Sequence, residues 1–399
     1  MVIKMDGNLP QHLIFDFDLF NDDRLKREDI HLGYRDLLAE APPVFFTPRN
    51  GGHWVVQSYD LVTELLKDHN RFSAAERSIP KAQTAFPMIP LYLDPPEHGP
   101  YRSELMRYFS PAVVRKLNDQ IRTWARRLIA DVADKGGCEF TEAIGARFPV
   151  SVFMEIMGMP LERFPEFRQI VGEYFAHWSD PVKRDAMREF VTGQMREITA
   201  QRRVEPRDDF FSHLVTMSIR GRDLTDQEIE SITLMMFVAG LDTVAGTLGF
   251  TYRNLAERPD IQQQLRENPE RIGAFVEESL RRYSVVLPPR VATQDCRLGE
   301  ADVRAGDMIL ASLPGAGFDP SIYAAPEKFE LDRTRPTLAF GTGAHVCLGN
   351  FLARAEMRIL TEEWVKAIPT FRRKPGSPSL SRLGPILALD TLELEWDRC

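Results

Sequence analysis

The feature that most constrains the fold is an apolar stretch at residues 225–256. It opens with Thr225 and Glu228, where the hydroxyl can cap the first turn of a helix and the carboxylate can return the bond. The segment that follows, ITLMMFVAGLDTVAGTLGF, is apolar on nearly every side of a helix. Because a helix without a polar face is buried on most sides, we expect other elements to surround this one.

Helical periodicity recurs along the chain, whereas strand-like runs are short. Besides 225–256, we predict helices over 59–69, 98–108, 112–135, 141–157, 182–203, 259–267, 270–283 and 348–366. The strand-like runs cover 53–58, 291–298 and 308–312. These patterns predict one domain over residues 1–399, mainly α with small peripheral β-sheets.

Composition restricts the classes of partner. The formal net charge of −8 disfavours nucleic acid, because phosphate contacts need a basic surface. The N-terminal stretch carries Asp6, Asp16 and Asp18 and lacks the basic flank and uninterrupted apolar run of a signal peptide or anchor. We therefore expect a cytoplasmic protein without a membrane partner.

A polar interruption, Ala239-Gly240-Leu241-Asp242-Thr243, lies inside the apolar stretch. One interpretation is a helix kink, with the threonine bonded to a backbone carbonyl and the aspartate paired with a distant Arg or Lys. The other is an opening where a small molecule binds and Asp242 and Thr243 deliver protons. The residues alone leave both open.

Glu278 and Arg281 lie three positions apart, on one face of the predicted helix 270–283. Spacing alone favours a solvated ion pair worth a few tenths of a kcal/mol, roughly. Phe275, one turn earlier, hints that the pair faces the interior.

The stretch FGTGAHVCLGNFL, residues 340–352, surrounds one cysteine with glycines. Cys347 precedes a predicted helix, where the aligned peptide dipoles favour a thiolate and lower a thiol pKa. Gly341, Gly343 and Gly349 permit left-handed turns and the close approach of a flat partner.

Three uses of this sulfur compete. It could be an unreactive core cysteine, a nucleophile with His345 as its base, or a metal or haem ligand. The four cysteines of the chain have no CxxC spacing, so neither a disulfide framework nor a zinc site is indicated. A haem ligand accounts for the lone sulfur and for a proton-donating pair on a distant buried helix.

Taken together, these residues resemble the cytochrome P450 family of haem-thiolate monooxygenases. The cysteine-loop motif of the family is matched by Phe340, Gly343, His345, Cys347 and Gly349. Its oxygen-activating helix motif is matched by Ala239, Gly240, Asp242 and Thr243, with Val244 departing at the last position. Glu278 and Arg281 match its Glu-x-x-Arg pair, and PEKF at 326–329 matches its Pro-Glu-Arg-Phe, with Lys328 in place of arginine.

The resemblance is nearest to the soluble bacterial camphor-hydroxylase-like branch. It implies a haem b, iron protoporphyrin IX, between the long central helix and the cysteine-loop helix, with Cys347 as the metal ligand. Asp242 and Thr243 would be catalytic, and Glu278 and Arg281 structural. The cofactor would also contact Phe340, Gly341, Gly349, Ala239 and Gly240. Its propionates would bind His98, Arg102, Arg290 and His345.

The same resemblance outlines a substrate pocket. Phe86 stands where the camphor hydroxylase has a tyrosine donor, so the pocket should favour apolar ligands. The remaining lining would come from Met88, Leu91, Met235, Val238, Val286 and Ile386. This predicts hydroxylation, with O2, of a small hydrophobic substrate that is terpenoid or ionone-like.

Electrons would come from a [2Fe-2S] ferredoxin, with a ferredoxin reductase upstream, and Arg102 and Arg354 are candidates for its docking patch. We expect a monomer. The alternative is a haem-thiolate binding or sensor protein without oxygenase activity, which the proton-donating pair argues against. A cysteine hydrolase is disfavoured because no base and orienting residue are evident.

Overall fold

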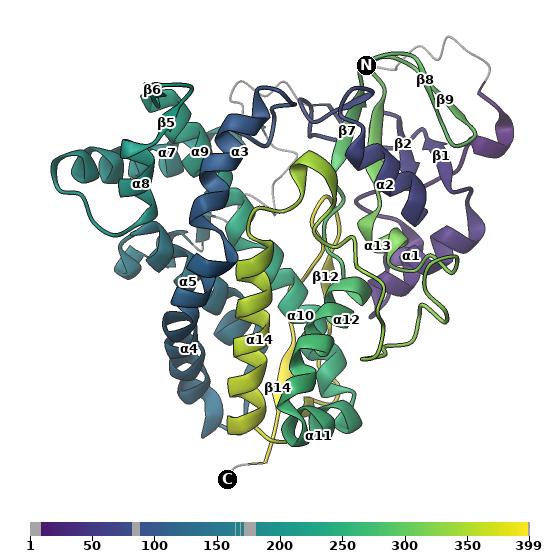
Figure 1. The fold of residues 1–399 in the computed structure, drawn as a ribbon. Helices are drawn as coiled ribbons and strands as arrows, with labels where there is room; N and C mark the ends of the chain where they lie inside the picture. The colour runs from purple at the N-terminus through teal and green to yellow at the C-terminus, as the bar shows by residue number, and fades with distance from the viewer. Residues whose placement is uncertain (1–8, 82–87, 164, 168, 171–180, 398–399) are drawn as a thin grey trace.

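The structure, a computed structural model, describes residues 9–81, 88–163, 165–167, 169–170 and 181–397. Its helices are α1 (Ile30–Glu40), α2 (Tyr59–Lys67), α3 (His98–Tyr108), α4 (Pro111–Ala133), α5 (Arg147–Met157), α7 (Pro181–Val204), α8 (Phe210–Thr216), α9 (Asp226–Leu241), α10 (Thr243–Ala256), α11 (Pro259–Glu267), α12 (Ile272–Arg282), α13 (Leu313–Ala316) and α14 (Asn350–Ala367). Figure 1 shows α14 in the middle of the molecule, with α4 on one side and α10 and α12 on the other. The prediction of a mainly helical fold is confirmed.

The central apolar stretch forms two helices instead of the predicted one. The capping box at its start is present, because Thr225 and Glu228 bond each other's backbone N–H groups. The helix is interrupted at Asp242, where α9 ends and α10 begins. The segment 226–256 is long and apolar enough to cross a membrane, but 65% of its most apolar part is buried inside the protein. This element is therefore the core helix that the sequence predicts.

The strands are short and lie mostly beside the helices (Figure 1). The largest sheet has the order β1 (Val44–Thr47), β2 (His53–Val56), β10 (Met308–Ala311), β7 (Pro289–Ala292) and β3 (Phe72–Ser73). Strand β10 runs parallel to β2, and the other pairs are antiparallel. Smaller sheets contain β4 (Gly137–Glu139), β5 (Ser218–Ile219), β6 (Arg222–Asp223), β8 (Cys296–Leu298), β9 (Ala301–Val303), β11 (Arg372–Arg373), β12 (Ser381–Arg382), β13 (Ala388–Leu389) and β14 (Glu393–Glu395).

Three sequence predictions of elements need correction. The strand predicted at 291–298 is two strands, β7 and β8, because the chain bends between them into a separate hairpin with β9. The helix predicted at 141–157 begins with a π-helical segment, Thr141–Ala146, before α5. Helices α1, α8 and α13 were not predicted; α8 and α13 are only seven and four residues long, which leaves little periodicity to detect.

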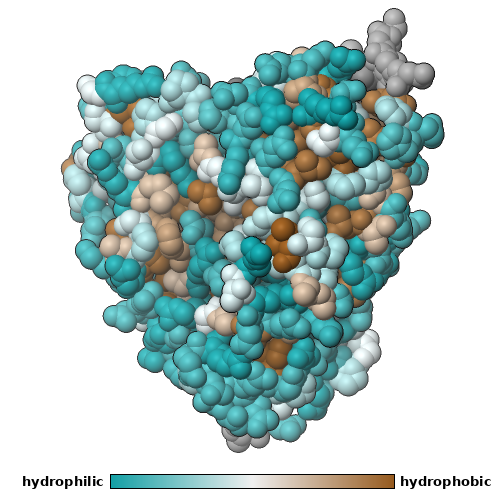
Figure 2. Space-filling view, turned by 45° about the vertical axis from the view of Figure 1, so that its right-hand side comes forward, coloured by the Kyte–Doolittle hydropathy of each residue, from teal (hydrophilic) through white to brown (hydrophobic). Residues whose placement is uncertain are grey.

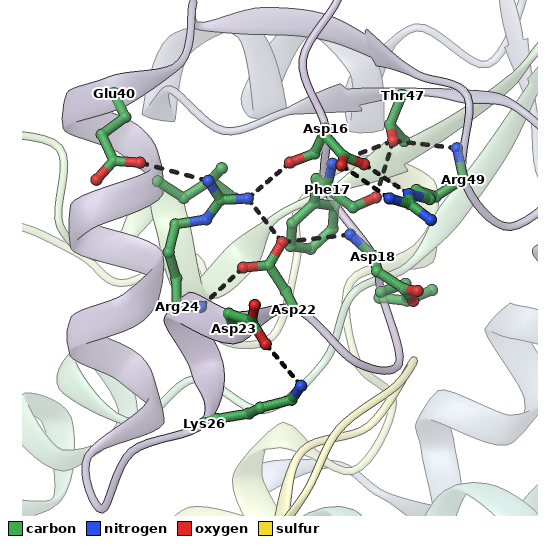
Figure 3. Close-up of polar contacts among 12 residues, drawn as sticks. Asp16, Phe17, Asp18, Asp22, Asp23, Arg24, Lys26, Glu40, Thr47 and Arg49 are labelled. Atoms are coloured by element: carbon green, nitrogen blue, oxygen red, sulfur yellow. Dashed lines mark hydrogen bonds and ion pairs between the residues drawn. The ribbon is translucent and has the colours of Figure 1, made fainter.

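Ion pairs fix the N-terminal segment, and one of them, together with one close contact, holds it against helix α1. Figure 3 shows Arg49 paired with Asp16 and Arg24 paired with Asp22 and Glu40. A Cβ atom added at Gly33 of α1 would lie 2.4 Å from the carbonyl oxygen of Arg24. The glycine therefore weakens the helical pattern in the sequence while permitting this packing.

The surface agrees with the composition. On the face shown in Figure 2, hydrophilic residues dominate and hydrophobic residues form small separate groups. Scattered exposed apolar residues are normal for globular proteins and mark no binding surface by themselves.

Two helical glycines provide a test of how closely the hairpin of β12 and β13 packs on α10. A Cβ atom at Gly246 would lie 2.6 Å from the carbonyl oxygen of Leu387, whereas one at Gly193 of α7 would meet nothing within 4 Å. We expect Gly246→Ala to lower the free energy of unfolding by about 1–3 kcal/mol through overpacking. The control Gly193→Ala should raise it by up to about 1 kcal/mol through helix propensity. Urea unfolding of both variants measures the difference, and equal effects would contradict the close packing.

Candidate active site

Most of the predicted site residues gather around one cavity of about 640 Å³. One wall is the end of α9 and the start of α10, and another is the loop that carries Cys347. The predicted apolar lining residues Met88, Leu91, Met235, Val238, Val286 and Ile386 all border it. Phe86 lies outside the described residues. The cavity therefore brings together residues that are far apart in the sequence.

The cysteine loop is held in shape by backbone hydrogen bonds. The N–H of Cys347 donates to the carbonyl of Phe340 at 2.9 Å, and the N–H of Gly341 donates to the carbonyl of Leu338 at 2.7 Å. Gly341 and Gly343 have φ angles of +66° and +75°, which confirms the predicted left-handed turns at these two positions. At Gly349 the prediction is wrong, since its φ is −85°.

The glycines also clear space, in two different ways. A Cβ atom at Gly343 would lie 2.6 Å from the carbonyl oxygen of Leu66, so this glycine lets the loop pack on α2. At Gly349 a Cβ atom would meet nothing within 4 Å, and both Gly349 and Gly341 border the cavity. A flat group in the cavity can therefore approach the loop at Gly341 and Gly349.

The pKa of the Cys347 thiol is shifted in the direction opposite to the prediction. Burial raises the pKa of the Cys347 thiol, and this outweighs the lowering by the Gly349 N–H and by the charges of Arg102 and Arg354. We had predicted a lowered pKa from the helix dipole, but α14 begins only at Asn350, beyond the cysteine. A buried thiol that stays protonated is a poor nucleophile, whereas a bound metal ion displaces the proton outright. In the described part of the chain, no group of three or more His, Cys, Asp or Glu side chains gathers as a metal site.

The break in the central helix lies across the cavity from the cysteine loop, and it agrees with both interpretations of this stretch, a helix kink and an opening for a ligand. The hydroxyl of Thr243 donates to the carbonyl of Ala239 at 3.1 Å, and Asp242 forms a 2.8 Å ion pair with Arg382. These are the contacts expected of a kink. Ala239, Gly240 and Thr243 also border the cavity, as an opening for a ligand requires.

Two details of this wall were not predicted. The ring of Phe153 packs on Gly240, where a Cβ atom would lie 2.7 Å from its Cδ2 atom. Asp242 does not border the cavity, but its partner Arg382 does. An acid that relays protons from here would act while paired with an arginine.

Basic groups gather on another side of the cavity. His98 and His345 lie with ring centroids 4.4 Å apart, and Arg102 and Arg290 border the same space. Burial and neighbouring arginines lower the pKa of His98 to about 4 and that of His345 to about 2. Burial also lowers the pKa of Arg290 to about 9. Nε2 of His345 is buried without a hydrogen-bond partner in the described structure.

The basic groups that border the cavity are suited to binding an anionic ligand there. Buried cations and donors without carboxylates are costly, and two carboxylates in the cavity would satisfy them. The residues present therefore fit a haem, whose flat ring needs clearance at the loop, whose iron needs a sulfur ligand and whose propionates need cationic partners.

Comparisons with known proteins agree with this geometry. The cytochrome P450 family profile matches residues 131–367. The probable cytochrome P450 127A1 of Sinorhizobium fredii is 34% identical, over 98% of this chain and 96% of that protein. The chain is a cytochrome P450. Nocardicin C N-oxygenase of Nocardia uniformis is 32% identical, over 86% of this chain and 89% of that protein.

The solved structures give the same result for the fold. The crystal structure of CYP101J2 matches with a TM-score of 0.90 at 33% identity, covering 98% of each chain. That of CYP101C1 matches with a TM-score of 0.88 at 28% identity, also covering 98% of each chain. The predicted resemblance, the P450 fold, the monooxygenase class and haem with a cysteine thiolate ligand are thereby confirmed.

This P450 also contains a buried charge cluster near the end of α12. Glu278 and Arg281 form a 2.7 Å ion pair with both side chains only 2% exposed, so the solvated pair favoured by spacing alone is wrong. The third member is Arg333, whose Nε lies 3.2 Å from Oε1 of Glu278. Lys328 is exposed and contributes only its backbone carbonyl, which accepts from both arginines.

Further residues of the P450 site were missed in the sequence. Glu356 of α14 borders the cavity, and burial raises its pKa to about 8, so it carries a proton at neutral pH. Arg77 and Arg382 also border the cavity. Glu356 lies seven residues after Gly349, the N-cap of α14, and this helical spacing could have indicated it. The two arginines lie in irregular or short segments that carry no such signal.

The charge cluster yields a matched pair of variants. Arg333→Gln removes a largely buried partner of Glu278 and should lower the free energy of unfolding by about 1–3 kcal/mol. Lys328→Gln changes an exposed side chain and should stay within about 0.5 kcal/mol of the parent. Chemical denaturation of the two variants compares them directly. A larger loss of unfolding free energy in Lys328→Gln would show that Lys328, which occupies the arginine position of the family motif, completes the cluster in place of Arg333.

Proposed function

We propose that this P450 monooxygenase hydroxylates a small, neutral, hydrophobic molecule of the terpenoid or ionone-like class. The observation that carries the proposal is the lining of the cavity, where six apolar side chains face the same space as Cys347 and Thr243. Two of the six are methionines, which adapt to irregular apolar ligands. This apolar part of the cavity would bind a ligand by shape and apolar contact.

We assign Cys347, through its sulfur, as the ligand of the haem iron, and His98, Arg102, Arg290 and His345 as propionate partners. When bound, the haem activates O2 and transfers one oxygen atom to a C–H bond of the substrate. The balance is one substrate, one O2, two electrons and two protons, giving one alcohol and one water. The protein must therefore deliver two protons to the cavity and exclude other routes for the electrons.

Thr243 and Asp242 are proposed to deliver these protons. The Thr243 hydroxyl donates to the Ala239 carbonyl within α9, and this bond fixes its position in the cavity wall. Asp242 lies behind the wall and pairs with Arg382, which borders the cavity. A carboxylate held in this way can take a proton from water and pass it to the hydroxyl.

A [2Fe-2S] ferredoxin, supplied by a reductase, is the proposed electron donor. Arg354 lies near the cysteine loop, with its guanidinium 4.5 Å from the ring centroid of Phe340, but it also pairs with Glu277. Arg102 is turned inward and donates to the carbonyl of Val346. Of the two predicted docking residues, Arg354 is thus the one on the outer surface, and its charge is partly offset. A monomeric, cytoplasmic, single-domain protein completes the proposal.

The substrate class is tested by ligand-induced spin shifts of the haem. Neutral monoterpenoids and ionones should displace the iron-bound water and give the high-spin spectrum at micromolar concentrations. Met235→Trp, which fills part of the cavity, should weaken the larger ligands of the panel by about tenfold or more. A panel in which no neutral terpenoid shifts the spectrum, while polar ligands do, would overturn the assignment.

The proton-delivery pair is tested by the coupling of electron use to product. Thr243→Ala should keep haem reduction but lower product per electron pair by about tenfold or more, with the electrons appearing as peroxide. Thr247→Ala is the matched control, because Thr247 lies one turn further along the same cavity wall and bonds the carbonyl of Thr243. It should remain coupled. Full coupling in Thr243→Ala, or equal loss in both variants, would contradict the assigned role.

A further inference from the structure

Arg77 is a half-buried cation for which the predicted site has no role. It follows β3 and borders the cavity. Its Nη1 is buried, and in the described structure this atom has no hydrogen-bond partner. An arginine carries five donors and stays charged, so leaving it buried without an anion is costly. Its position therefore calls for an anion within the cavity.

The surroundings of Arg77 show where that anion would lie. The charge of Arg77 acts on both Arg290 and His345, so the three groups lie within electrostatic reach of one another. Tyr92 and Asp94 are the groups whose charges act on Arg77, and of the two Asp94 is the carboxylate. Its carboxylate already accepts hydrogen bonds from the N–H of Ala74 and the hydroxyl of Ser73. Arg77 and Arg290 together thus exceed the negative charge near them.

The other guanidiniums of the cluster are partly committed. Arg102 donates to the carbonyl of Val346, and Arg290 donates through Nη1 to the carbonyl of Pro289. The side chain of Arg77, in contrast, has its Nη1 unpaired. A planar guanidinium with free donors is suited to binding a carboxylate through two parallel hydrogen bonds.

We propose that Arg77 binds a carboxylate in the cavity, and that this carboxylate is a haem propionate shared with Arg290 and His345. A carboxylate on a substrate has the same chemistry and is the competing source. The haem is favoured because Arg290 and His345 are already among the predicted propionate partners. Arg77 is then a positioning residue that retains the cofactor and is not a catalytic residue.

The test is the rate at which the holoenzyme loses haem to excess apomyoglobin. Arg77→Gln should speed haem loss by about tenfold, the effect of one charge-assisted hydrogen bond. Arg77→Lys keeps the charge without the planar fork and should give a smaller increase. Arg304→Gln is the control, because Arg304 is exposed and pairs with Asp295 on the surface. It should lose haem at the parent rate.

A second arm identifies the source of the carboxylate. With the iron porphyrin dimethyl ester, whose propionates carry no charge, parent and Arg77→Gln proteins should lose the cofactor at equal rates. A difference that persists with the ester would overturn the propionate assignment. So would an unchanged rate of haem loss together with the selective loss of dodecanoate binding relative to dodecanol. If Arg77→Gln does not fold, both measurements are made on Arg77→Lys, and the expected difference in the rate of haem loss is smaller.

Discussion

The burial of one ionisable sulfur organises this structure. Cys347 lies at the cavity with its thiol pKa raised by burial, so the isolated protein favours the protonated thiol. A metal ion reverses this preference, because coordination removes the proton and the thiolate then offsets the charge of the metal. The loop that presents the sulfur needs left-handed turns at Gly341 and Gly343 and packs on α2 at the second of them. The sulfur, the cysteine loop and α2 therefore form one packed unit, and binding of the cofactor stabilises this unit.

The charges around this unit follow the same logic. On one side of the cavity, Arg290 is buried and Arg77 and Arg102 are half-buried beside two histidines with lowered pKa values. An uncharged ligand would leave these arginines uncompensated. Near the end of α12, Glu278 is already compensated by Arg281 and Arg333, so that cluster is structural. Arg281 also donates to the carbonyls of Gly317 and Pro326, which fastens the chain that leads into the cysteine loop. The protein thus contains one charge cluster that is complete and one that requires a ligand.

The sequence predicted features that depend on local pattern and missed those that depend on distant contacts. The apolar periodicity around the capping box, the glycines of the cysteine loop and the Glu-x-x-Arg spacing are local, and they predicted the core helix, the sulfur site and the ion pair. A kink at Asp242 was one of two open interpretations, and the residues alone could not decide for it because the partner, Arg382, lies on a strand 140 residues later. Arg333 was missed for a similar reason, since the family pattern pointed to Lys328. The thiol pKa was predicted in the wrong direction because a sequence shows a helix start but not the depth of burial.

The central claim is that Cys347 binds haem iron as a thiolate, and the absorption spectrum of the reduced, CO-bound protein tests it most directly. The parent protein should show the long-wavelength Soret band of thiolate-ligated haem. Cys347→Ser should lose that band, while Cys138→Ser, a cysteine on β4 away from the cavity, should keep it. A parent spectrum without the band, or a Cys347→Ser spectrum that retains it, would contradict the account.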